Sequence, residues 1–234
     1  EDRMSVRLGR GIRPTMRSHN DLESATDQQS VVVPDWRDRK RYVWLLGLVV
    51  PTLVPMSWAA GAVTGLGVFW WSGPLLMFVG IPLLDYLVGK DAENPPESAL
   101  AWLEQDRFYR WATYLYLPAQ YLSLALACWL WSGGGGVSLG VVDAIGLMLT
   151  VGGIAGVAIN TAHELGHQRD GAERWLSKIA LAQTGYGHFY VEHNRGHHAR
   201  VATPQDPASS RLGESVYAFF FRSSFGGPRS AWAL

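Results

Sequence analysis

The sequence predicts an all-α integral membrane protein with four transmembrane helices, followed by a histidine-rich helical region on the cytoplasmic side. The first observation is a set of apolar stretches long enough to cross a bilayer, which takes about 20 residues per helix. The second is the placement of the histidines: five of the seven fall between His163 and His198. Charged residues make up only 17% of the chain and the formal net charge is zero, so nothing indicates a nucleic acid partner.

The first half of the chain divides by composition into a polar arm and an apolar region. Residues 1–35 are polar, carry mixed charges and lack apolar periodicity, which predicts a mobile N-terminal arm preceding a membrane domain over 36–234. Residues 42–84 contain no charged side chain and can cross a bilayer twice. We expect helices at about 43–63 and 68–88, with a glycine-containing turn between them.

Two further spans are predicted downstream of a polar segment. They lie at about 111–131 and 141–160, and a run of four glycines separates them. The fourth span carries glycines that predict close packing against neighbouring helices: Gly146, Gly152, Gly153 and Gly156. The apolar segment 179–190 is too short to cross and predicts a buried or re-entrant helix. The chain after Val201 is expected to be polar, beginning with a loop at 203–207.

The basic residues predict the orientation of these spans. With four spans, all 20 lysines and arginines fall on the side that holds both termini. Cytoplasmic loops carry the excess of positive charge in membrane proteins. Both histidine-rich segments are therefore expected at the cytoplasmic membrane edge.

The two histidine-rich segments predict a metal site. They read His163-Glu-Leu-Gly-His167 and His193-Asn-Arg-Gly-His197-His198, and we call them the first and second box. Side chains four residues apart share one face of an α-helix, so each box can bind one ion through its i, i+4 pair. His198 lies about 100° further round its helix and can reach towards a second ion. Imidazole is a good ligand for iron, zinc, copper and nickel.

The two histidines outside the boxes carry weaker predictions. His19 lies in the polar arm and is expected to be solvated. His188, in Gly185-Tyr-Gly-His188-Phe189, either orients a metal ligand without touching the metal or is simply a packed, hydrogen-bonded side chain.

Several chemistries are compatible with the first box alone. His163-Glu164-x-x-His167 is the zinc-peptidase pattern, with Glu164 as general base, but a peptidase has no use for the second box. A transporter would place its polar ligands near the bilayer midplane. All-histidine ligation at a membrane edge favours an iron pair that activates oxygen for an apolar substrate. The only cysteine, Cys128, excludes a four-cysteine cluster within this chain, so a separate carrier must supply electrons for redox chemistry.

Longer motifs resemble a known family. They are Asn160-Thr-Ala-His-Glu-Leu-Gly-His167, Gly185-Tyr-Gly-His-Phe189, Glu192-His-Asn-Arg-Gly-His-His198, Asp206-Pro-Ala-Ser-Ser210 and Asn94-Pro-Pro-Glu97. Together they resemble the membrane-bound alkane 1-monooxygenases among the histidine-box di-iron oxygenases and desaturases. The resemblance implies terminal hydroxylation of medium-chain alkanes with O2 at two non-haem irons, in a bacterial inner membrane with the site on the cytoplasmic side. It also implies electrons from rubredoxin, which an NADH-dependent reductase reduces.

The resemblance also assigns roles to individual residues. Its implied metal ligands are His163, His167, His193, His197 and His198. Three further residues become candidates to orient those ligands through hydrogen bonds: Glu164, Glu192 and His188. Glu164 is then no peptidase base. A desaturase or fatty-acid hydroxylase with similar boxes stays an alternative, because the histidines alone do not set the outcome of the oxygen chemistry.

The resemblance extends from about Trp36 to the end of the chain. The family's fifth and sixth spans, an isolated histidine and a third box are expected beyond Leu234. We therefore expect this chain to be the N-terminal part of the enzyme, with the remaining iron ligands supplied by the later part.

Overall fold

The computed structural model describes residues 36–91, 94–168 and 170–234, and these form helices and loops without any strand. The predicted N-terminal arm, including His19, lies outside the described residues. Within the described ranges, three helices are long and apolar enough to cross a membrane: Arg41–Thr64, Gly67–Val88 and Val141–His167. The prediction of an all-helical integral membrane protein is thus confirmed at this level.

The first two membrane helices are built from several shorter segments. The first comprises η1 (Arg41–Leu48), η2 (Val50–Thr52) and α2 (Leu53–Thr64), and the second comprises η3 (Gly67–Trp71), α3 (Ser72–Leu75), η4 (Leu76–Gly80) and α4 (Ile81–Val88). The first ends at Gly65, whose φ of 72° places it in the left-handed region that favours glycine at a helix C-terminus. This glycine makes the predicted turn between the two spans.

The next long helices are α6 (Arg107–Trp131) and α7 (Val141–His167), preceded by the short helix α5 (Glu97–Gln105). The Asp106 side chain caps α6 by accepting a hydrogen bond from the Phe108 N–H at 2.9 Å. Helix α6 has the length and position predicted for the third span. It is less apolar than the other three because tyrosine and glutamine side chains interrupt its sequence, including Tyr116 and Gln120.

Small residues let α7 pack closely against the second membrane helix. A Cβ at Gly146 would lie 2.6 Å from the Trp71 ring, and one at Gly153 would lie 2.9 Å from Met77 Cε. The packing predicted from the glycines is therefore confirmed at these two positions. At Gly152 and Gly156 a Cβ would meet nothing within 4 Å, so these two make no such contact within the described residues.

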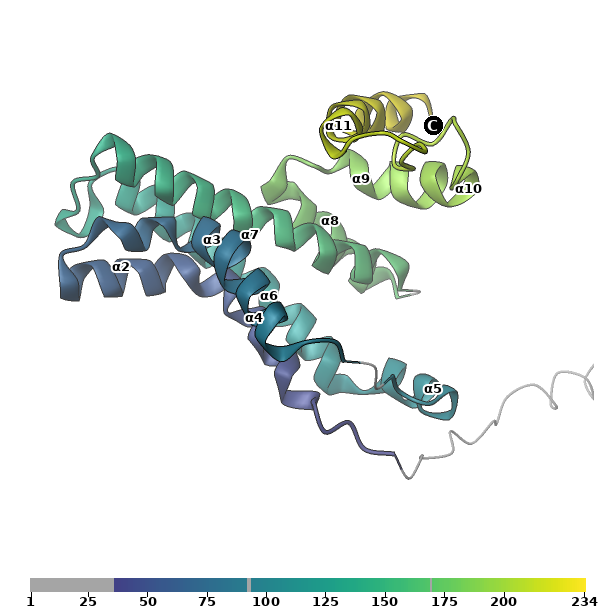
Figure 1. Ribbon diagram of the computed structural model, residues 1–234, viewed down its shortest axis with the longest axis horizontal. Helices are drawn as coiled ribbons and strands as arrows, with labels where there is room; N and C mark the ends of the chain where they lie inside the picture. The colour runs from purple at the N-terminus through teal and green to yellow at the C-terminus, as the bar shows by residue number, and fades with distance from the viewer. Residues whose placement is uncertain (1–35, 92–93, 169) are drawn as a thin grey trace, which may run out of the picture.

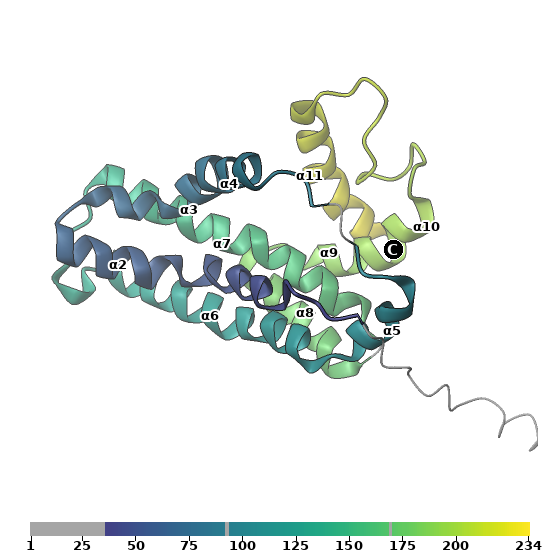
Figure 2. The ribbon, with the colours of Figure 1, turned by 60° about the horizontal axis from the view of Figure 1, so that its bottom comes forward.

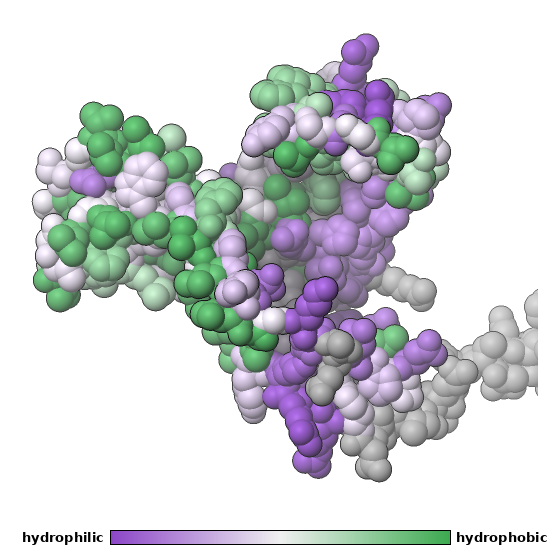
Figure 3. Space-filling model, in the orientation of Figure 1, coloured by the Kyte–Doolittle hydropathy of each residue, from purple (hydrophilic) through white to green (hydrophobic). Residues whose placement is uncertain are grey.

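The elements are arranged as a helical bundle with a separate cap (Figure 1). Helices α2, α3, α6 and α7 lie side by side, and α8 (Gly171–Thr184) folds back along α7 (Figures 1 and 2). The cap consists of α9 (His188–Val191), η6 (Glu192–His197), α10 (His198–Arg200) and α11 (Val216–Ala233). Hydrophobic residues cover much of the bundle on the left of the view, whereas hydrophilic residues gather on the right (Figure 3).

Two predictions for the region after the first box are wrong. The apolar segment 179–190 is no single joining helix: α8 ends at Thr184, and Gly185, with a φ of 64°, turns the chain before α9. The chain after Val201 is also more than a polar tail, because α11 carries exposed aromatic side chains. These are Tyr217, Phe220, Phe221, Phe225 and Trp232.

Candidate metal centre

The first box occupies the last turns of α7. His163 and His167 lie on one face, with their Nε2 atoms 3.1 Å apart, as the i, i+4 spacing predicts. Helix α8 fixes this end of α7, because the Ser177 hydroxyl donates to the Ala162 carbonyl at 2.6 Å. Leu165, between the two histidines, is buried in the cluster that joins α7 to α8. The two rings therefore project from a helix end with little freedom to move apart.

The second box lies on η6, which is a π-helix, except for His198, the first residue of α10. Its i→i+5 bonding aligns residues five apart, and the His193 and His198 Nε2 atoms are 3.1 Å from each other. The predicted i, i+4 pair of this box is arranged differently from that of the first box: the His193 and His197 rings are stacked, with centroids 5.4 Å apart. The change of helix type brings a different pair of nitrogens together.

The two boxes meet at one point. His193 Nε2 lies 3.0 Å from His167 Nε2, and ligand atoms of His163, His167 and His193 all lie within 4.8 Å of one another. These residues come from two elements separated by α8 and α9. Four of the five predicted ligands thus converge: the three just named and His198, which joins them through His193.

This donor set fits a metal ion. Burial and the surrounding imidazoles of His163, His198, His167 and His197 lower the pKa of His193 to about 4, so its ring is neutral at neutral pH and offers a lone pair. Each neutral imidazole carries only one N–H. The three close contacts among these Nε2 atoms cannot all be hydrogen bonds, because one N–H points at one acceptor, whereas a cation between the rings accepts every lone pair.

The fifth predicted ligand, His197, is held by a buried carboxylate. Its Nδ1 lies 2.8 Å from Oδ2 of Asp206, which is only 1% exposed. Burial alone would raise the pKa of Asp206, but hydrogen bonds from the Ser209 hydroxyl, the Ala208 N–H and His197 together lower it. The carboxylate therefore stays charged, holds the proton on Nδ1 and leaves Nε2 of His197 available to a metal.

Asp206 was not singled out as a functional residue from the sequence. It stands nine residues after His197, at the start of the motif Asp206-Pro-Ala-Ser-Ser210. That motif was the available signal, because a carboxylate close behind a histidine ligand is a recurrent arrangement at metal sites.

The three residues predicted to support the ligands are placed differently from one another. Glu164 Oε1 lies 3.3 Å from His163 Nδ1, and its side chain is 70% exposed. Glu192 is buried and pairs with Arg200 at 3.3 Å. Arg200 in turn donates to Ser230 on α11 at 2.5 Å, so Arg200 links Glu192 of η6 to α11. Among the described residues, the Glu192 carboxylate is bonded to Arg200 and to no histidine.

His188 is the third of these residues. Its Nε2 is buried and has no hydrogen-bond partner among the described residues, and burial lowers its pKa. It lies beside the Tyr186 ring, with centroids 4.2 Å apart. Together with His193 and His197 it lines a cavity of about 220 Å³ between η6 and α11, so it is packed there while its Nε2 makes no hydrogen bond to a described residue.

Comparison with known proteins finds a family whose model is similar to the second part of this chain. Residues 139–234, which contain both boxes, match the fatty acid desaturase family.

More specific matches cover most of the chain. It is 43% identical over 198 residues to alkane 1-monooxygenase 1 of Alcanivorax borkumensis, covering 84% of this chain and 48% of that protein. It is 42% identical over 221 residues to alkane 1-monooxygenase of Ectopseudomonas oleovorans, covering 94% and 52%, and 43% identical over 203 residues to that of Pseudomonas putida, covering 86% and 49%. The chain spans about half the length of these relatives. The resemblance to membrane-bound alkane 1-monooxygenases is confirmed.

Proposed function

We propose that the protein hydroxylates the terminal carbon of medium-chain alkanes, using O2 and two histidine-bound irons. The observation that supports this most is the convergence of histidines from both boxes at the end of an apolar helical bundle. The names of the relatives supply the reaction. The overall change is RH + O2 + 2 e⁻ + 2 H⁺ → ROH + H2O, and iron, when bound, supplies the activation of O2.

The residues of this chain would divide the work at that centre. His163, His167, His193 and His198 would bind iron directly, and His197 would do so through Nε2 while Asp206 holds its Nδ1. Two irons with about four or five ligands each need more than five histidines. The additional ligands would come from a further histidine box, as the resemblance to the family implies.

The partners follow from the same proposal. Rubredoxin, reduced by an NADH-dependent reductase, would bring the electrons, since this chain has a single cysteine and cannot build a four-cysteine cluster alone. The alkane would enter from the lipid, where apolar chains are concentrated, and reach the end of the bundle between the membrane helices.

We further propose that α6 is a fourth span and that the metal centre faces the cytoplasm of a bacterial inner membrane. The distribution of basic residues supports this orientation. In a Cys128→Ala background, a cysteine at Ser132 should react with a membrane-impermeant maleimide from outside, and one at Ala172 only after the membrane is opened. Both positions are exposed. Equal labelling of the two cysteines in sealed cells would overturn the four-span orientation.

The activity itself is tested with the full-length protein in membranes. Rubredoxin, its reductase, NADH and octane should give 1-octanol, and His167→Ala should give none. Octene as the main product would favour a desaturase, the alternative that the match to the fatty acid desaturase family supports. Zinc instead of iron, with cleavage of membrane peptides, would indicate the peptidase.

A further inference from the structure

The loop between α10 and α11 is held to α11 by the side chain of Arg222. Its Nε and Nη2 donate to the two carboxylate oxygens of Glu214, each at 2.7 Å. Its Nη1 donates to the Pro207 carbonyl at 3.2 Å, and its Nη2 also donates to the Ser209 carbonyl at 2.7 Å. A guanidinium presents its donors in a rigid planar fork, so this one side chain joins both ends of the loop to α11.

The two carbonyls that Arg222 binds belong to the turn that positions Asp206. Within this turn the Asp206 carboxylate accepts a hydrogen bond from the Ser209 hydroxyl. Helix α11 also touches the turn directly, since a Cβ at Gly226 would lie 2.7 Å from the Cβ of Pro207. The backbone that carries Asp206 is therefore fixed against α11.

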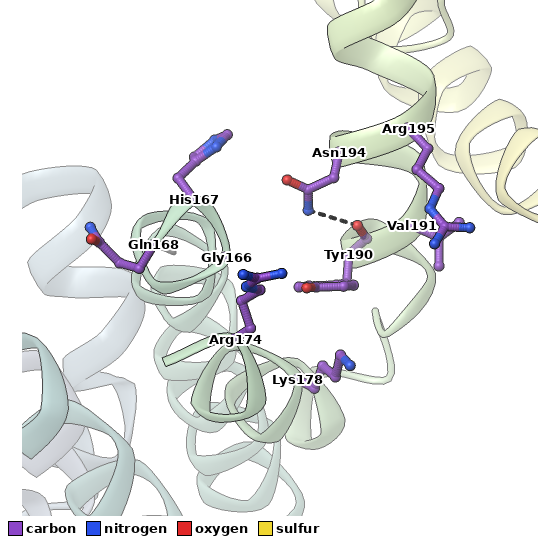
Figure 4. Close-up of a pocket in the computed structure, with 9 residues that line it drawn as sticks. All are labelled: Gly166, His167, Gln168, Arg174, Lys178, Tyr190, Val191, Asn194 and Arg195. Atoms are coloured by element: carbon purple, nitrogen blue, oxygen red, sulfur yellow. Dashed lines mark hydrogen bonds between the residues drawn. The ribbon is translucent and has the colours of Figure 1, made fainter. Parts of the chain in front are cut away.

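This turn makes the contact that supports a predicted metal ligand. Asp206 Oδ2 lies 2.8 Å from Nδ1 of His197, so any shift of the turn moves the carboxylate relative to the ring. The start of the second box is held in another way, within its own helical segment, where Asn194 donates to the Tyr190 carbonyl at 2.8 Å (Figure 4). The support of His197 thus comes from the loop, and Arg222 holds the loop.

The ion pair between Arg222 and Glu214 is largely shielded from solvent. The side chains are 22% and 10% exposed, respectively. Hydrogen bonds from Arg222 and from the Arg211 N–H lower the pKa of Glu214 to about 2, so its carboxylate is charged at every pH at which the histidine rings are neutral. Charge-assisted pairs in this two-pronged geometry are stronger than neutral hydrogen bonds. The loop therefore keeps its position under the conditions in which metal would bind.

We propose that Arg222 is a positioning residue for the metal centre, acting on His197 through the turn at 206–209 and the Asp206 carboxylate. The inference rests on the proposed function, because His197 would bind one of the irons. A guanidinium has no acceptor lone pair, so Arg222 itself binds no metal and its effect is indirect. That effect should disappear when the carboxylate that transmits it is absent.

The test measures the Fe²⁺ affinity of the full-length protein by competition with a chelator, in a double-mutant cycle. Arg222→Ala should weaken iron binding about tenfold, the lower end of the range for residues that support a ligand. In an Asp206→Asn background the same change should have little further effect. Arg229→Ala removes an arginine from an exposed position of the same helix and should bind iron as wild type does.

Two further measurements separate positioning from a general loss of stability. Arg222→Lys keeps the charge but lacks the planar fork, so its iron affinity should lie between those of wild type and Arg222→Ala. With Co²⁺ in place of iron, the visible absorption reports the coordination geometry. The Co²⁺ spectrum of Arg222→Ala should resemble that of Asp206→Asn and differ from that of wild type.

Three results would overturn the proposal. Wild-type iron affinity in Arg222→Lys or Arg222→Ala would show that the turn needs no arginine fork. An equal loss of affinity with and without the Asp206 carboxylate would show that Arg222 acts through stability alone. A wild-type protein that binds no iron would contradict the proposed function as well, whereas the first two results contradict only the role of Arg222.

Discussion

The two histidine boxes share one local pattern but hold their side chains on different kinds of helix. Each contains His-x-x-Gly-His: residues 163–167 in the first box and residues 193–197 in the second. In the first, an α-helix brings the i, i+4 pair together. In the second, a π-helix brings His193 to His198 and leaves His197 facing Asp206. Identical spacing can therefore give two ligand geometries, since the helix type sets which residues align.

The glycine in each box has a different neighbourhood. A Cβ at Gly196 would lie 2.4 Å from Glu192 Oε2 and 2.6 Å from Arg200 Nη2, so the buried ion pair crosses directly over this position. A Cβ at Gly166 would lie 3.2 Å from the Ser177 hydroxyl and no closer than 3.8 Å to Tyr190 and Asn194. The second box is thus linked to α11 through Arg200, which pairs with Glu192 and donates to Ser230. The close approach of this ion pair requires a glycine at position 196, whereas no ion pair crosses Gly166.

The largest effects should follow removal of the convergent rings. His167→Ala and His193→Ala should each lower bound iron and turnover at least about 100-fold, more than the loss of a residue that only supports a ligand. Each removes a nitrogen from the point where the boxes meet. Iron content and 1-octanol formation measure this, with His19→Ala as the control expected to match wild type. Normal iron in His193→Ala would show that the π-helical box is no part of the centre.

A smaller effect should follow loss of the carboxylate behind His197. Asp206→Asn keeps the shape but removes the charge that holds the proton on Nδ1, so iron should bind about 10–100-fold more weakly. Competition with a chelator measures the affinity. The matched variant Ser209→Ala keeps the carboxylate and removes two hydrogen bonds, one to Asp206 and one from the Ala202 N–H, each worth about 1 kcal/mol. If Asp206→Asn bound iron as tightly as wild type, the role given to this carboxylate would be refuted.

The two glycines offer a direct test of the contrast in stability. Gly196→Ala should lower the free energy of unfolding by about 1–3 kcal/mol, because the methyl group displaces the Glu192–Arg200 pair. In Gly166→Ala the gain in helix propensity, about 0.5–1 kcal/mol, should offset the tight contact with Ser177. Denaturant unfolding in detergent, followed by tryptophan fluorescence, compares the two. Equal losses in both variants would mean that the ion pair contributes nothing to the second box.

The smallest effect is expected at Glu164. Its carboxylate is exposed and lies 3.3 Å from the adjacent His163. Residues that support a metal ligand usually change metal affinity or activity by about 10–100-fold when they are replaced. Because Glu164 is exposed, Glu164→Gln should change iron affinity or turnover by less than about tenfold. A general base would behave differently, since its removal eliminates turnover while metal stays bound. The ratio of turnover to bound iron separates the two cases.

The sequence by itself determined the placement of three of the four predicted membrane helices and the geometry of the first box. Bilayer thickness is a property of the solvent, so uncharged runs of sufficient length identify the spans wherever they occur, and Gly65 marks the turn between two of them. His163 and His167 are neighbours through a local repeat. The predictions for segments 179–190 and 201–234 were wrong. A turn at Gly185 divides the first segment, and in the second the aromatic residues of α11 are interspersed with polar ones.

Only the tertiary structure decided how the boxes meet. The pairs His167–His193 and His197–Asp206 are separated by 26 and 9 residues, and their contacts depend on the path of the chain through α8, the Gly185 turn and the loop after Val201. Spacing determines contacts within one helix, whereas contacts between helices arise from the packing that buries Leu165 and Leu181 together.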